Sequence, residues 1–544
     1  MAAGSASNAG SFYIPTPTPT PRPRVVESPV PPAPTPSPDL NTLQTLDSLR
    51  ARIVQRLTAP EVRRGRVGIK IVSLNTGKVV FETDADKYFI PASNMKNFTV
   101  AAALERLGPD FKFVTSVRAA SPLDADGTIH GPLVIVGRGD VSASTSFDPA
   151  FPKVIDHYKA LDALADKIAA AGVKKVDGDL IADESYFQGF AVPETWEWDD
   201  IEGYDGTEIS AFPLNDNVVD ITVSGGGVGA PCVVGVRPAN QIVRFNNACV
   251  TTNSGTAQVS LRKDMDQNVV TISGTFPAGG KEFVRSIAFT HPAELYIALL
   301  KERLAAKGVN VSGGVQTRNA EWYSANNRPI MSRSLPALPL QLGDKGQSQG
   351  GTEITKVESP PFSVIAAKTL KPSQNNYTET ILWTLGEEFG RKTGGSGTSQ
   401  QLGVGVVRAF LTSIGIPADG IVQYDGSGMS RHDLITPNAV VQLYTYMAKQ
   451  SKFSQVWRDS LTIGGVDGTL RNRFKGTRAE GNIRGKTGTL DQVSALSGYV
   501  TTAGGEQLVI SIVTNNLPIA GSARKAFEDD IVVALANFNG KIDQ

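Results

Sequence analysis

The chain has 544 residues with 53 basic and 53 acidic side chains, so its formal net charge at pH 7 is zero. This balance argues against a nucleic-acid or membrane-surface protein, because both need a basic excess to hold phosphates. No apolar run approaches the roughly 18–20 residues of a membrane span. With 40% hydrophobic residues, two cysteines and four histidines, the sequence indicates a multidomain globular protein without a zinc or iron–sulfur site, and we expect no cofactor.

Residues 1–41 differ from the rest of the chain in their proline content, with runs such as Pro15-Thr16-Pro17-Thr18-Pro19. Such a composition cannot build a core, and it predicts an extended or disordered tether. No basic start followed by an apolar stretch is present, so no secretion signal is visible. A Pro/Thr tether before a folded domain is nevertheless more typical of exported proteins, and we expect an exported protein.

Hydrophobic periodicity predicts the elements that follow. The first are an amphipathic helix over 40–56, a β-hairpin formed by 67–72 and 79–82, and a helix over 93–107. The region 112–354 is rich in short β-like runs, with helices over 157–171 and 292–307. The last are helices over 361–370, 376–389, 399–414 and 437–450, strands over 495–500 and 507–514, and a helix over 522–538.

This order of elements predicts an α+β fold. Two parts, 42–111 and 355–544, are expected to form one domain, which a β-rich insertion over 112–354 interrupts. We expect two nested subdomains within the insertion, the inner one covering about 220–285.

The two cysteines are placed symmetrically in the sequence. Cys232 and Cys249 flank a possible turn at Asn240-Gln241, and 233–236 and 242–245 look like strands. A two-residue turn would put the cysteines directly opposite each other, within reach of a disulfide. The alternative is two buried thiols, because the bond depends on both the register and an oxidising compartment.

The first candidate for chemistry is Ser93-Asn94-Met95-Lys96. Three-residue spacing places Ser93 and Lys96 on one helix face. A neutral lysine amine can take the hydroxyl proton and make the serine nucleophilic. Ser93 could instead only cap the helix, but a lysine in the first turn fits a cap poorly, because the helix dipole disfavours cations there. Equivalent Ser-x-x-Lys patterns at 260–263 and 522–525 show that the spacing alone is weak evidence.

Two further motifs contain polar side chains suited to acyl transfer. Lys486-Thr487-Gly488-Thr489 precedes an apolar strand, and a lysine with two hydroxyls beside a glycine suits a carboxylate-bearing substrate; an ordinary glycine turn is the alternative. Ser373-Gln374-Asn375 opens a predicted helix, where Ser and Asn are usually caps.

The order Ser-x-x-Lys, Ser-x-Asn and Lys-Thr-Gly is the active-site set of penicillin-recognising serine acyl-transferases. The chain resembles the D-alanyl-D-alanine carboxypeptidase/endopeptidase family of class C, type-4 low-molecular-mass penicillin-binding proteins, from about residue 45 to 540. The motifs that carry the resemblance are Pro91-Ala92-Ser93-Asn94-Met95-Lys96, Gly137-Arg138-Gly139-Asp140, Asp425-Gly426-Ser427-Gly428-Met429-Ser430-Arg431, Gly465-Val466-Asp467-Gly468-Thr469-Leu470 and Lys486-Thr487-Gly488-Thr489-Leu490.

The resemblance implies a transpeptidase-like domain, an antiparallel sheet flanked by helices, interrupted by the insertion. It implies that Ser93 attacks the carbonyl between two D-alanines of a peptidoglycan stem peptide while Lys96 accepts its proton. Ser373 would pass that proton to the departing amine, and Asn375 would hold the peptide amide. β-Lactams would acylate Ser93 and hydrolyse slowly, and the protein would work in the periplasm or cell envelope.

The remaining implied roles concern substrate binding. Lys486 would keep the site electropositive and depress the pKa of Lys96, while Thr487 and Thr489, with Gly488 leaving room between them, would hold the terminal carboxylate. The backbone N–H groups of Ser93 and Thr489 would form the oxyanion hole. Arg431 and Asp183 match places that face the charged end of the peptidoglycan side chain, although a surface cation and a turn carboxylate are equally good interpretations.

Two departures from the family pattern and two rival functions remain. Leu461-Thr462 stands where the family commonly has Leu-Pro. Gln374 stands where the family usually has Asp, which affects no proton-transfer group but leaves substrate preference open. A β-lactamase would share the acylation residues, but it usually has about half this length. A catalytically silent cell-wall binding protein is the other rival, and three intact motifs argue against it. The oligomeric state has no signature in the sequence.

Overall fold

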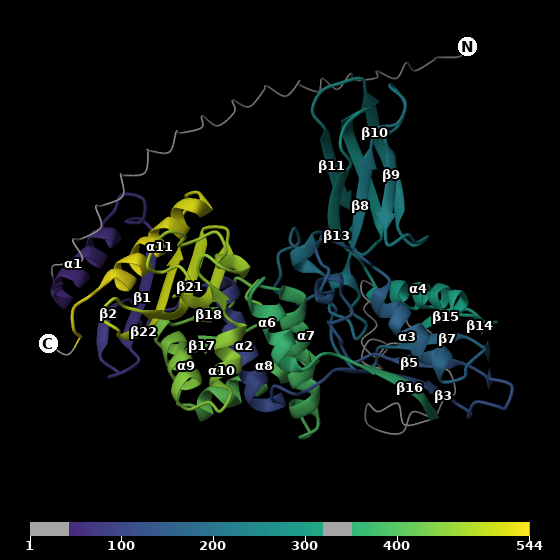
Figure 1. The fold of residues 1–544 in the computed structure, drawn as a ribbon, viewed down its shortest axis with the longest axis horizontal. Coiled ribbons are helices and arrows are strands. Elements are labelled where there is room, and N and C mark those ends of the chain that lie inside the picture. Colours follow the sequence, from purple (N-terminus) through teal and green to yellow (C-terminus); the bar gives the residue numbers. More distant parts are fainter. Residues whose placement is uncertain (1–42, 319–350, 543–544) are drawn as a thin grey trace, which may run out of the picture. The chain divides into compact units, whose positions relative to one another are not determined.

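The structure is a computed structural model that describes residues 43–318 and 351–542. The tether predicted for 1–41 lies outside the described residues. The frame of one part is a six-stranded antiparallel sheet with the order β19-β20-β21-β22-β1-β2 (Figure 1). Its strands are β1 (Arg66–Ser73), β2 (Val79–Thr83), β19 (Thr462–Ile463), β20 (Arg484–Leu490), β21 (Val493–Thr501) and β22 (Gln507–Asn515).

The sheet joins distant parts of the chain. β1 pairs with the predicted hairpin partner β2 on one side and with β22 on the other, in a register that runs from Arg66↔Asn515 to Ser73↔Leu508. Side chains alternate between the two faces of β22: Leu508, Ile510 and Ile512 belong to one hydrophobic cluster, and Val509 belongs to another. The apolar run of β22 is therefore buried on both faces.

Helices cover both faces of this sheet. On the face of Ile510 and Ile512 lie α1 (Leu46–Leu57) and α11 (Gly521–Asn537), which bury Ile53 and Phe527 there. The helices of the other cluster are α2 (Lys96–Leu107), α6 (Phe362–Leu370), α7 (Asn375–Leu385), α8 (Ser399–Ser413), α9 (Pro437–Lys449) and α10 (Ser454–Ser460). The α+β arrangement of an antiparallel sheet flanked by helices confirms the predicted fold class.

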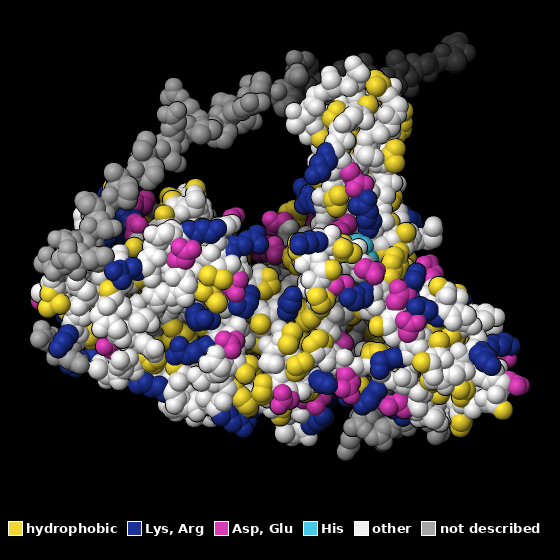
Figure 2. Space-filling view, in the orientation of Figure 1, with side chains coloured by type: hydrophobic (Ala, Val, Ile, Leu, Met, Phe, Trp, Pro, Cys, Tyr) yellow, Lys and Arg dark blue, Asp and Glu magenta, His cyan; other side chains and the backbone are white. Residues whose placement is uncertain are grey.

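Shorter elements connect these helices and strands. They are the 3-10 helices η1 (Ala92–Met95) and η6 (Gly468–Leu470), the π-helical turn η5 (Gly386–Arg391), and the paired strands β17 (Ile421–Val422) and β18 (Leu434–Ile435). Among the described residues, no helix has both the length and the apolar character that crossing a membrane requires. On the face seen in Figure 2, basic and acidic side chains are intermingled.

The insertion contains a five-stranded sheet, β15-β7-β5-β3-β16, and a three-stranded sheet, β14-β6-β4. Their elements are β3 (Val114–Ala119), β4 (Thr128–His130), β5 (Leu133–Val136), β6 (Lys175–Asp177), β7 (Leu180–Asp183), β14 (Asn310–Val311), β15 (Val315–Arg318) and β16 (Thr352–Glu358), with α3 (Lys159–Ala170) and α4 (Pro292–Ala306). The boundary predicted between 354 and 355 falls inside β16, which pairs with β3, so the sheet of the insertion extends to Glu358.

Two more three-stranded sheets, β13-β8-β9 and β10-β12-β11, occupy the middle of the insertion, near the predicted inner subdomain. We call them the β-module. Its strands are β8 (Val218–Ser224), β9 (Val233–Arg237), β10 (Arg244–Thr252), β11 (Gln258–Lys263), β12 (Val269–Pro277) and β13 (Phe283–Ala288). Cys232 and Cys249 form a disulfide there, with their Cα atoms 5.3 Å apart.

The hairpin expected between the cysteines is wrong. β9 pairs with β8, and β10 pairs in parallel with β12. Asn240 Oδ1 accepts hydrogen bonds from the backbone N–H groups of Ile242 and Val243, so the chain forms an Asx turn here instead of the expected two-residue hairpin turn. The cysteines are nevertheless directly opposite, because Cys232 N donates to Cys249 O at 2.9 Å beside an isolated bridge.

Candidate active site

Ser93 and Lys96 meet at the junction of η1 and α2. Lys96 is the first residue of α2, and its Nζ lies 2.9 Å from Ser93 Oγ. Ser93 is inside η1, whose N-cap is Pro91, so the capping interpretation of this serine is wrong. Ala92 has φ +48°, and Gly428 lies so close that a Cβ there would be 1.9 Å from Ala92 O. The strained turn that carries Ser93 is therefore packed directly against Gly428.

Lys96 is completely buried and donates to two acceptors besides Ser93. Its Nζ lies 2.6 Å from Asn375 Oδ1 and 2.7 Å from the carbonyl oxygen of Ser427. Burial lowers the pKa of Lys96 to about 8, against the pull of nearby carboxylates, Asp425 first. At neutral pH a useful fraction of this amine is uncharged and can accept the proton of Ser93.

Two buried carboxyl groups position the Ser427 carbonyl, and neither was assigned a role from the sequence. Glu379 accepts from the backbone N–H groups of Gly426 and Ser427, the latter at 2.7 Å. Asp425 accepts from Gly428 N at 2.6 Å and also from Ser430 N. The only sequence signal for this loop was the Asp-Gly-Ser-Gly motif that carries the family resemblance.

Ser373 and Lys486 form the second pair. Ser373 lies two residues before the start of α7, has φ +70°, and accepts from Lys486 Nζ at 2.8 Å. The N-cap of α7 is Gln374, so Ser373 is not the cap that its position allowed. Burial, and then the positive charge of Lys96, lower the pKa of Lys486 well below its usual range. Lys486 was expected to lower the pKa of Lys96. In the structure the largest cause of the lowered pKa is the burial of Lys96 itself.

The Lys-Thr-Gly motif lies within strand β20 rather than before a strand, with Lys486 opposite Ser497 on β21. A Cβ at Gly488 would lie 2.6 Å from Pro91 O and 3.1 Å from Ser93 N, so only glycine lets β20 run this close to the nucleophile turn. Asn94 Nδ2 also donates to Lys486 O at 3.3 Å. The first and third motifs are therefore in direct contact.

Two threonines of β20 were predicted to bind substrate. Thr487 is buried and its Oγ1 lies 2.7 Å from Thr469 Oγ1, whereas Thr489 is exposed. Thr469 lies in η6 and had no role in the sequence-based prediction. The motif that contains Thr469 was recognised only as part of the family resemblance. Its contact with Thr487 could not be read from the sequence, because it forms only when the turn at η6 packs against β20.

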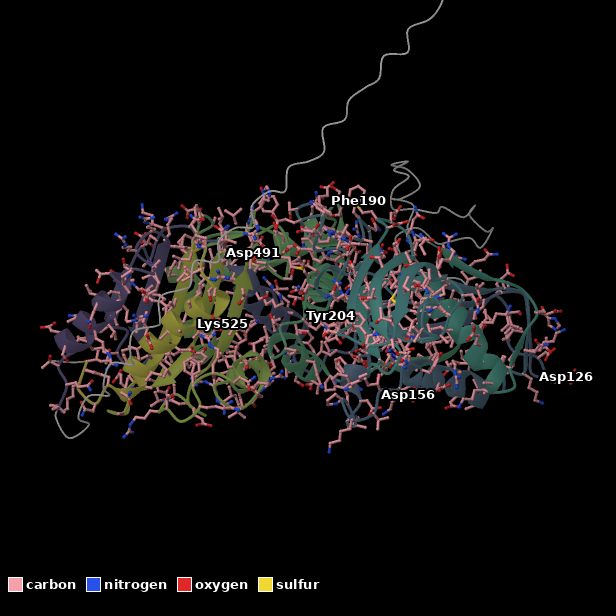
Figure 3. All side chains as sticks on the ribbon, turned by 90° about the horizontal axis from the view of Figure 1, so that it is seen from above. Asp126, Asp156, Phe190, Tyr204, Asp491 and Lys525 are labelled. Carbon is pink, nitrogen blue, oxygen red and sulfur yellow. A yellow bond between two sulfur atoms is a disulfide. The ribbon has the colours of Figure 1, made fainter. Side chains whose placement is uncertain are left out.

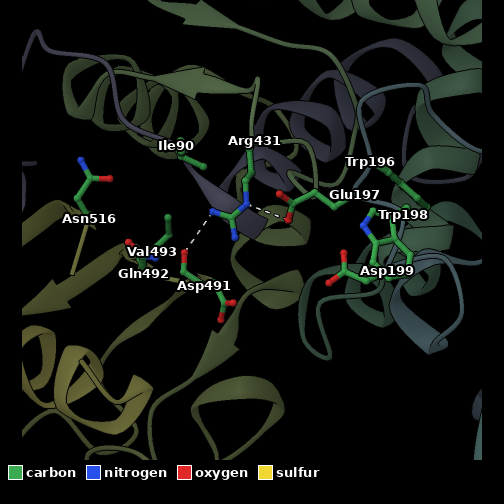
Figure 4. Close-up of a pocket in the computed structure, with 10 residues that line it drawn as sticks. All are labelled: Ile90, Trp196, Glu197, Trp198, Asp199, Arg431, Asp491, Gln492, Val493 and Asn516. Carbon is green, nitrogen blue, oxygen red and sulfur yellow. Dashed lines mark hydrogen bonds and ion pairs between the residues drawn. The ribbon is translucent and has the colours of Figure 1, made fainter. Parts of the chain in front are cut away.

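Arg431 lies in a cavity of about 800 Å³ next to the 425–431 loop, together with Trp196, Trp198 and Asp199 (Figure 4). Its Nε lies 3.0 Å from Glu197 Oε2, and its NH1 donates to Asp491 O at 3.2 Å. The half-exposed guanidinium is thus oriented by the insertion on one side and by the β20–β21 turn on the other.

Asp183 does not lie in this cavity. It is completely buried on β7 and forms an ion pair with Arg318 NH1 at 3.2 Å. A buried carboxylate with its own guanidinium partner is a structural group rather than a ligand contact. The cavity beside Arg431 does not include Asp183, whose predicted contact with substrate stays a prediction; the acidic residues beside Arg431 are Glu197 and Asp199.

Comparisons with known proteins agree with this geometry. Residues 49–341 and 337–538 match the D-Ala-D-Ala carboxypeptidase 3 (S13) family. The chain is also 33% identical over 510 residues to the D-alanyl-D-alanine carboxypeptidase of Actinomadura sp. (strain R39), which covers 91% of this chain and 86% of that protein. The chain belongs to the S13 D-Ala-D-Ala carboxypeptidase family.

Solved structures support the same fold. The crystal structure of penicillin-binding protein 4 from Haemophilus influenzae superposes with a TM-score of 0.72 at 22% identity, and the match covers 92% of this chain and 100% of that one. A second structure of that protein, in complex with a β-lactam, gives a TM-score of 0.66 at 21% identity. The S13 chain therefore shares the fold of penicillin-binding protein 4, insertion included.

Proposed function

We propose that this S13 family member is a serine D-Ala-D-Ala carboxypeptidase/endopeptidase that acts on peptidoglycan stem peptides through an acyl-enzyme on Ser93. The observation that carries the proposal is the 2.9 Å contact between Ser93 Oγ and a buried lysine amine whose pKa is about 8. A hydroxyl beside a neutral amine is the arrangement that makes serine a nucleophile.

The reaction begins with proton transfer from Ser93 Oγ to Lys96 Nζ as the oxygen attacks the carbonyl between the two D-alanines. When the tetrahedral intermediate collapses, the C–N bond breaks and the leaving amine takes up the proton that Lys96 had accepted, passed on through Ser373 Oγ, which lies 2.8 Å from Lys486 Nζ. Water then attacks the ester, releases the shortened peptide and returns the proton to Ser93.

Charge that develops on the carbonyl oxygen needs preorganised donors. The backbone N–H groups of Ser93 and Thr489 are our candidates, because β20 runs against the nucleophile turn at Gly488. One such donor is worth about 3–4 kcal/mol in other acyl-transfer enzymes. Lys486, Thr487 and Thr489 are assigned to the terminal carboxylate of the substrate, and Asn375 to its peptide amide.

Arg431 is assigned to the charged end of the stem-peptide side chain. Its cavity places a guanidinium beside Glu197 and Asp199, so it offers partners for both an anionic and a cationic group. We further propose that the protein works outside the cytoplasm, in the periplasm or cell envelope. The Cys232–Cys249 disulfide supports this, because such bonds persist in oxidising compartments.

The test uses fluorescent penicillin on the Ser93→Ala variant. We expect covalent labelling to disappear while the unfolding temperature stays within a few degrees of the parent value. The matched control is Ser522→Ala, which removes the serine of the Ser-x-x-Lys pattern on α11 and should keep full labelling. Labelling that persists in Ser93→Ala would assign the nucleophile elsewhere.

Two activities separate this proposal from its rivals. Release of D-alanine from a D-Ala-D-Ala peptide marks the peptidase, whereas fast turnover of a chromogenic β-lactam marks a β-lactamase. Neither activity marks a silent cell-wall binding protein. We expect D-alanine release together with slow β-lactam turnover.

A further inference from the structure

One stretch of the insertion, residues 196–208, contacts two segments that supply groups to the active site: the 425–431 loop and the Ser-x-Asn motif. We call it the 196–208 segment. Trp196 Nε1 donates to Asp425 Oδ2 at 2.9 Å, in the loop whose Ser427 carbonyl accepts from Lys96. In the same loop, Arg431 pairs with Glu197. The insertion therefore touches the loop that supports the catalytic amine.

The 196–208 segment also receives hydrogen bonds from three consecutive amide side chains, those of the Ser-x-Asn motif and the residue after it. The pairs are Gln374 Nε2 with Tyr204 OH, Asn375 Nδ2 with Asp205 O at 3.0 Å, and Asn376 Nδ2 with Thr207 Oγ1 and Glu208 O, both at 3.0 Å. Every amide of this stretch is thus held by the insertion.

These contacts fix which end of the Asn375 amide faces the catalytic amine. Its Nδ2 can only donate, and it meets the carbonyl oxygen of Asp205; its Oδ1 accepts from Lys96 Nζ at 2.6 Å. Rotating the amide by half a turn would put donor against donor and oxygen against oxygen. The orientation of Asn375 is therefore set by a backbone carbonyl of the insertion.

Tyr204 anchors this arrangement through its hydroxyl. The hydroxyl accepts from Gln374 Nε2 and donates to Asp216 Oδ2 at 2.8 Å, so it has one partner on the motif and one inside the insertion. In Figure 3, Tyr204 lies near the centre of the view. Gln374, buried and placed where the family usually has Asp, supplies the donor that this hydroxyl accepts.

We propose that the 196–208 segment positions the Ser-x-Asn motif for acylation, and that Tyr204 is a positioning residue that acts through Gln374. The proposal rests on the proposed function, since it concerns the rate at which Ser93 is acylated. It gives the insertion a role in the chemistry although none of its side chains touches Ser93 or Lys96 among the contacts of the described residues.

The test compares Tyr204→Phe with Tyr186→Phe. Tyr186 is also in the insertion, and its hydroxyl donates to Glu388 Oε1 at 2.7 Å, away from the motif, so it controls for the loss of a tyrosine–carboxylate bond. Acylation by benzylpenicillin is followed by intact-protein mass spectrometry over a range of concentrations. We expect Tyr204→Phe to lower the limiting acylation rate roughly five- to ten-fold, with half-saturation changed less than two-fold. Tyr186→Phe should stay within two-fold of the parent.

A double-mutant cycle tests the route of the effect. In a Gln374→Met background, where the amide is already gone, Tyr204→Phe should slow acylation by less than two-fold further. An undiminished effect in that background, an unchanged rate in the single variant, or an equal loss in Tyr186→Phe would each overturn the proposal. A parent protein that benzylpenicillin never acylates would instead refute the proposed function.

Discussion

At the residue scale, the protonation of Lys96 controls acylation. The amine can accept the Ser93 proton only when it is uncharged, and its pKa is lowered from 10.5 to about 8 by burial. The uncharged fraction therefore rises as the pH rises through about 8 and is small at pH 6. Burial disfavours the charged form of Lys96, and catalysis needs the uncharged form. Desolvation and catalysis therefore favour the same protonation state of this residue.

The first prediction is a pH profile. The limiting rate of acylation by benzylpenicillin should increase about ten-fold per pH unit below the lysine pKa and level off above pH 8, because the reactive form is the free base. Rapid-mixing measurements between pH 5.5 and pH 9.5 at roughly constant ionic strength check this. A rate that is flat over the whole range would show that Lys96 is not the base.

The catalytic side chains themselves were predictable from sequence because their spacing is local. Ser93 and Lys96 are one helical turn apart, and the turn forms as expected. Glu379 and Thr469 were not predictable, because each reaches the site only after distant segments fold together. The ion pair of Asp183 with Arg318 was not predictable either, because the two residues are 135 positions apart in sequence.

At the element scale, the close packing of α7 on α8 fixes the position of the Ser-x-Asn motif at the start of α7. A Cβ at Gly403 on α8 would lie 2.1 Å from Leu382 O, and one at Gly386, just after α7, would lie 2.0 Å from Ser399 O. The helices therefore touch backbone to backbone. Since Asn375 is the first residue of α7, a shift of this helix moves the motif away from Lys96.

The second prediction uses two glycines of α8. Gly405 has nothing within 4 Å of its would-be Cβ, whereas Gly403 contacts Leu382 O. Gly405→Ala should raise the free energy of unfolding by about 0.5–1 kcal/mol, because alanine is the better helix former. Gly403→Ala should lower it by about 1–3 kcal/mol and slow acylation, because the helices must separate.

Urea unfolding and penicillin acylation measure both variants. Equal effects of the two substitutions on stability would contradict the close packing of α7 on α8. A destabilised Gly403→Ala protein that acylates at the parent rate would show that the motif does not move with α7.

Most elements of the catalytic part could be predicted from sequence, and strand pairing in the insertion could not. Periodicity located α6 to α9 and β22 within a few residues, since each has a continuous apolar face. The partner of β9 is β8 rather than β10, a choice that depends on side chains brought together only in three dimensions. The opposition of the two cysteines was predicted, although through a turn that does not form.

At the scale of the whole molecule, the contacts with the active-site loops and the disulfide lie in different parts of the insertion. The 196–208 segment contacts the active-site loops, whereas the disulfide lies in the β-module. The Cys232–Cys249 bond closes a loop with a sequence separation of 17. A loop of this size is worth about 3 kcal/mol in the chain-entropy description of disulfides.

The third prediction separates these two parts of the insertion. The double variant Cys232→Ser/Cys249→Ser should make the β-module sensitive to limited proteolysis within 225–280 and lower its stability by up to about 3 kcal/mol. Acylation by benzylpenicillin should remain within two-fold of the parent rate. Peptide mapping locates the cuts, and a large loss of acylation would show that the β-module is needed to hold the 196–208 segment.

The pairing of β1 with β22 has a consequence for biosynthesis. The nucleophile is made early, but Lys486 and the strand that closes the sheet are made late, and Asn94 and Ser497, in buried contact, are 403 residues apart in sequence. A chain that ends before β20 therefore lacks Lys486 and the strand that packs against the nucleophile turn at Gly488. The contacts that join the nucleophile turn to β20 and β21 can therefore form only when translation has passed Ser497.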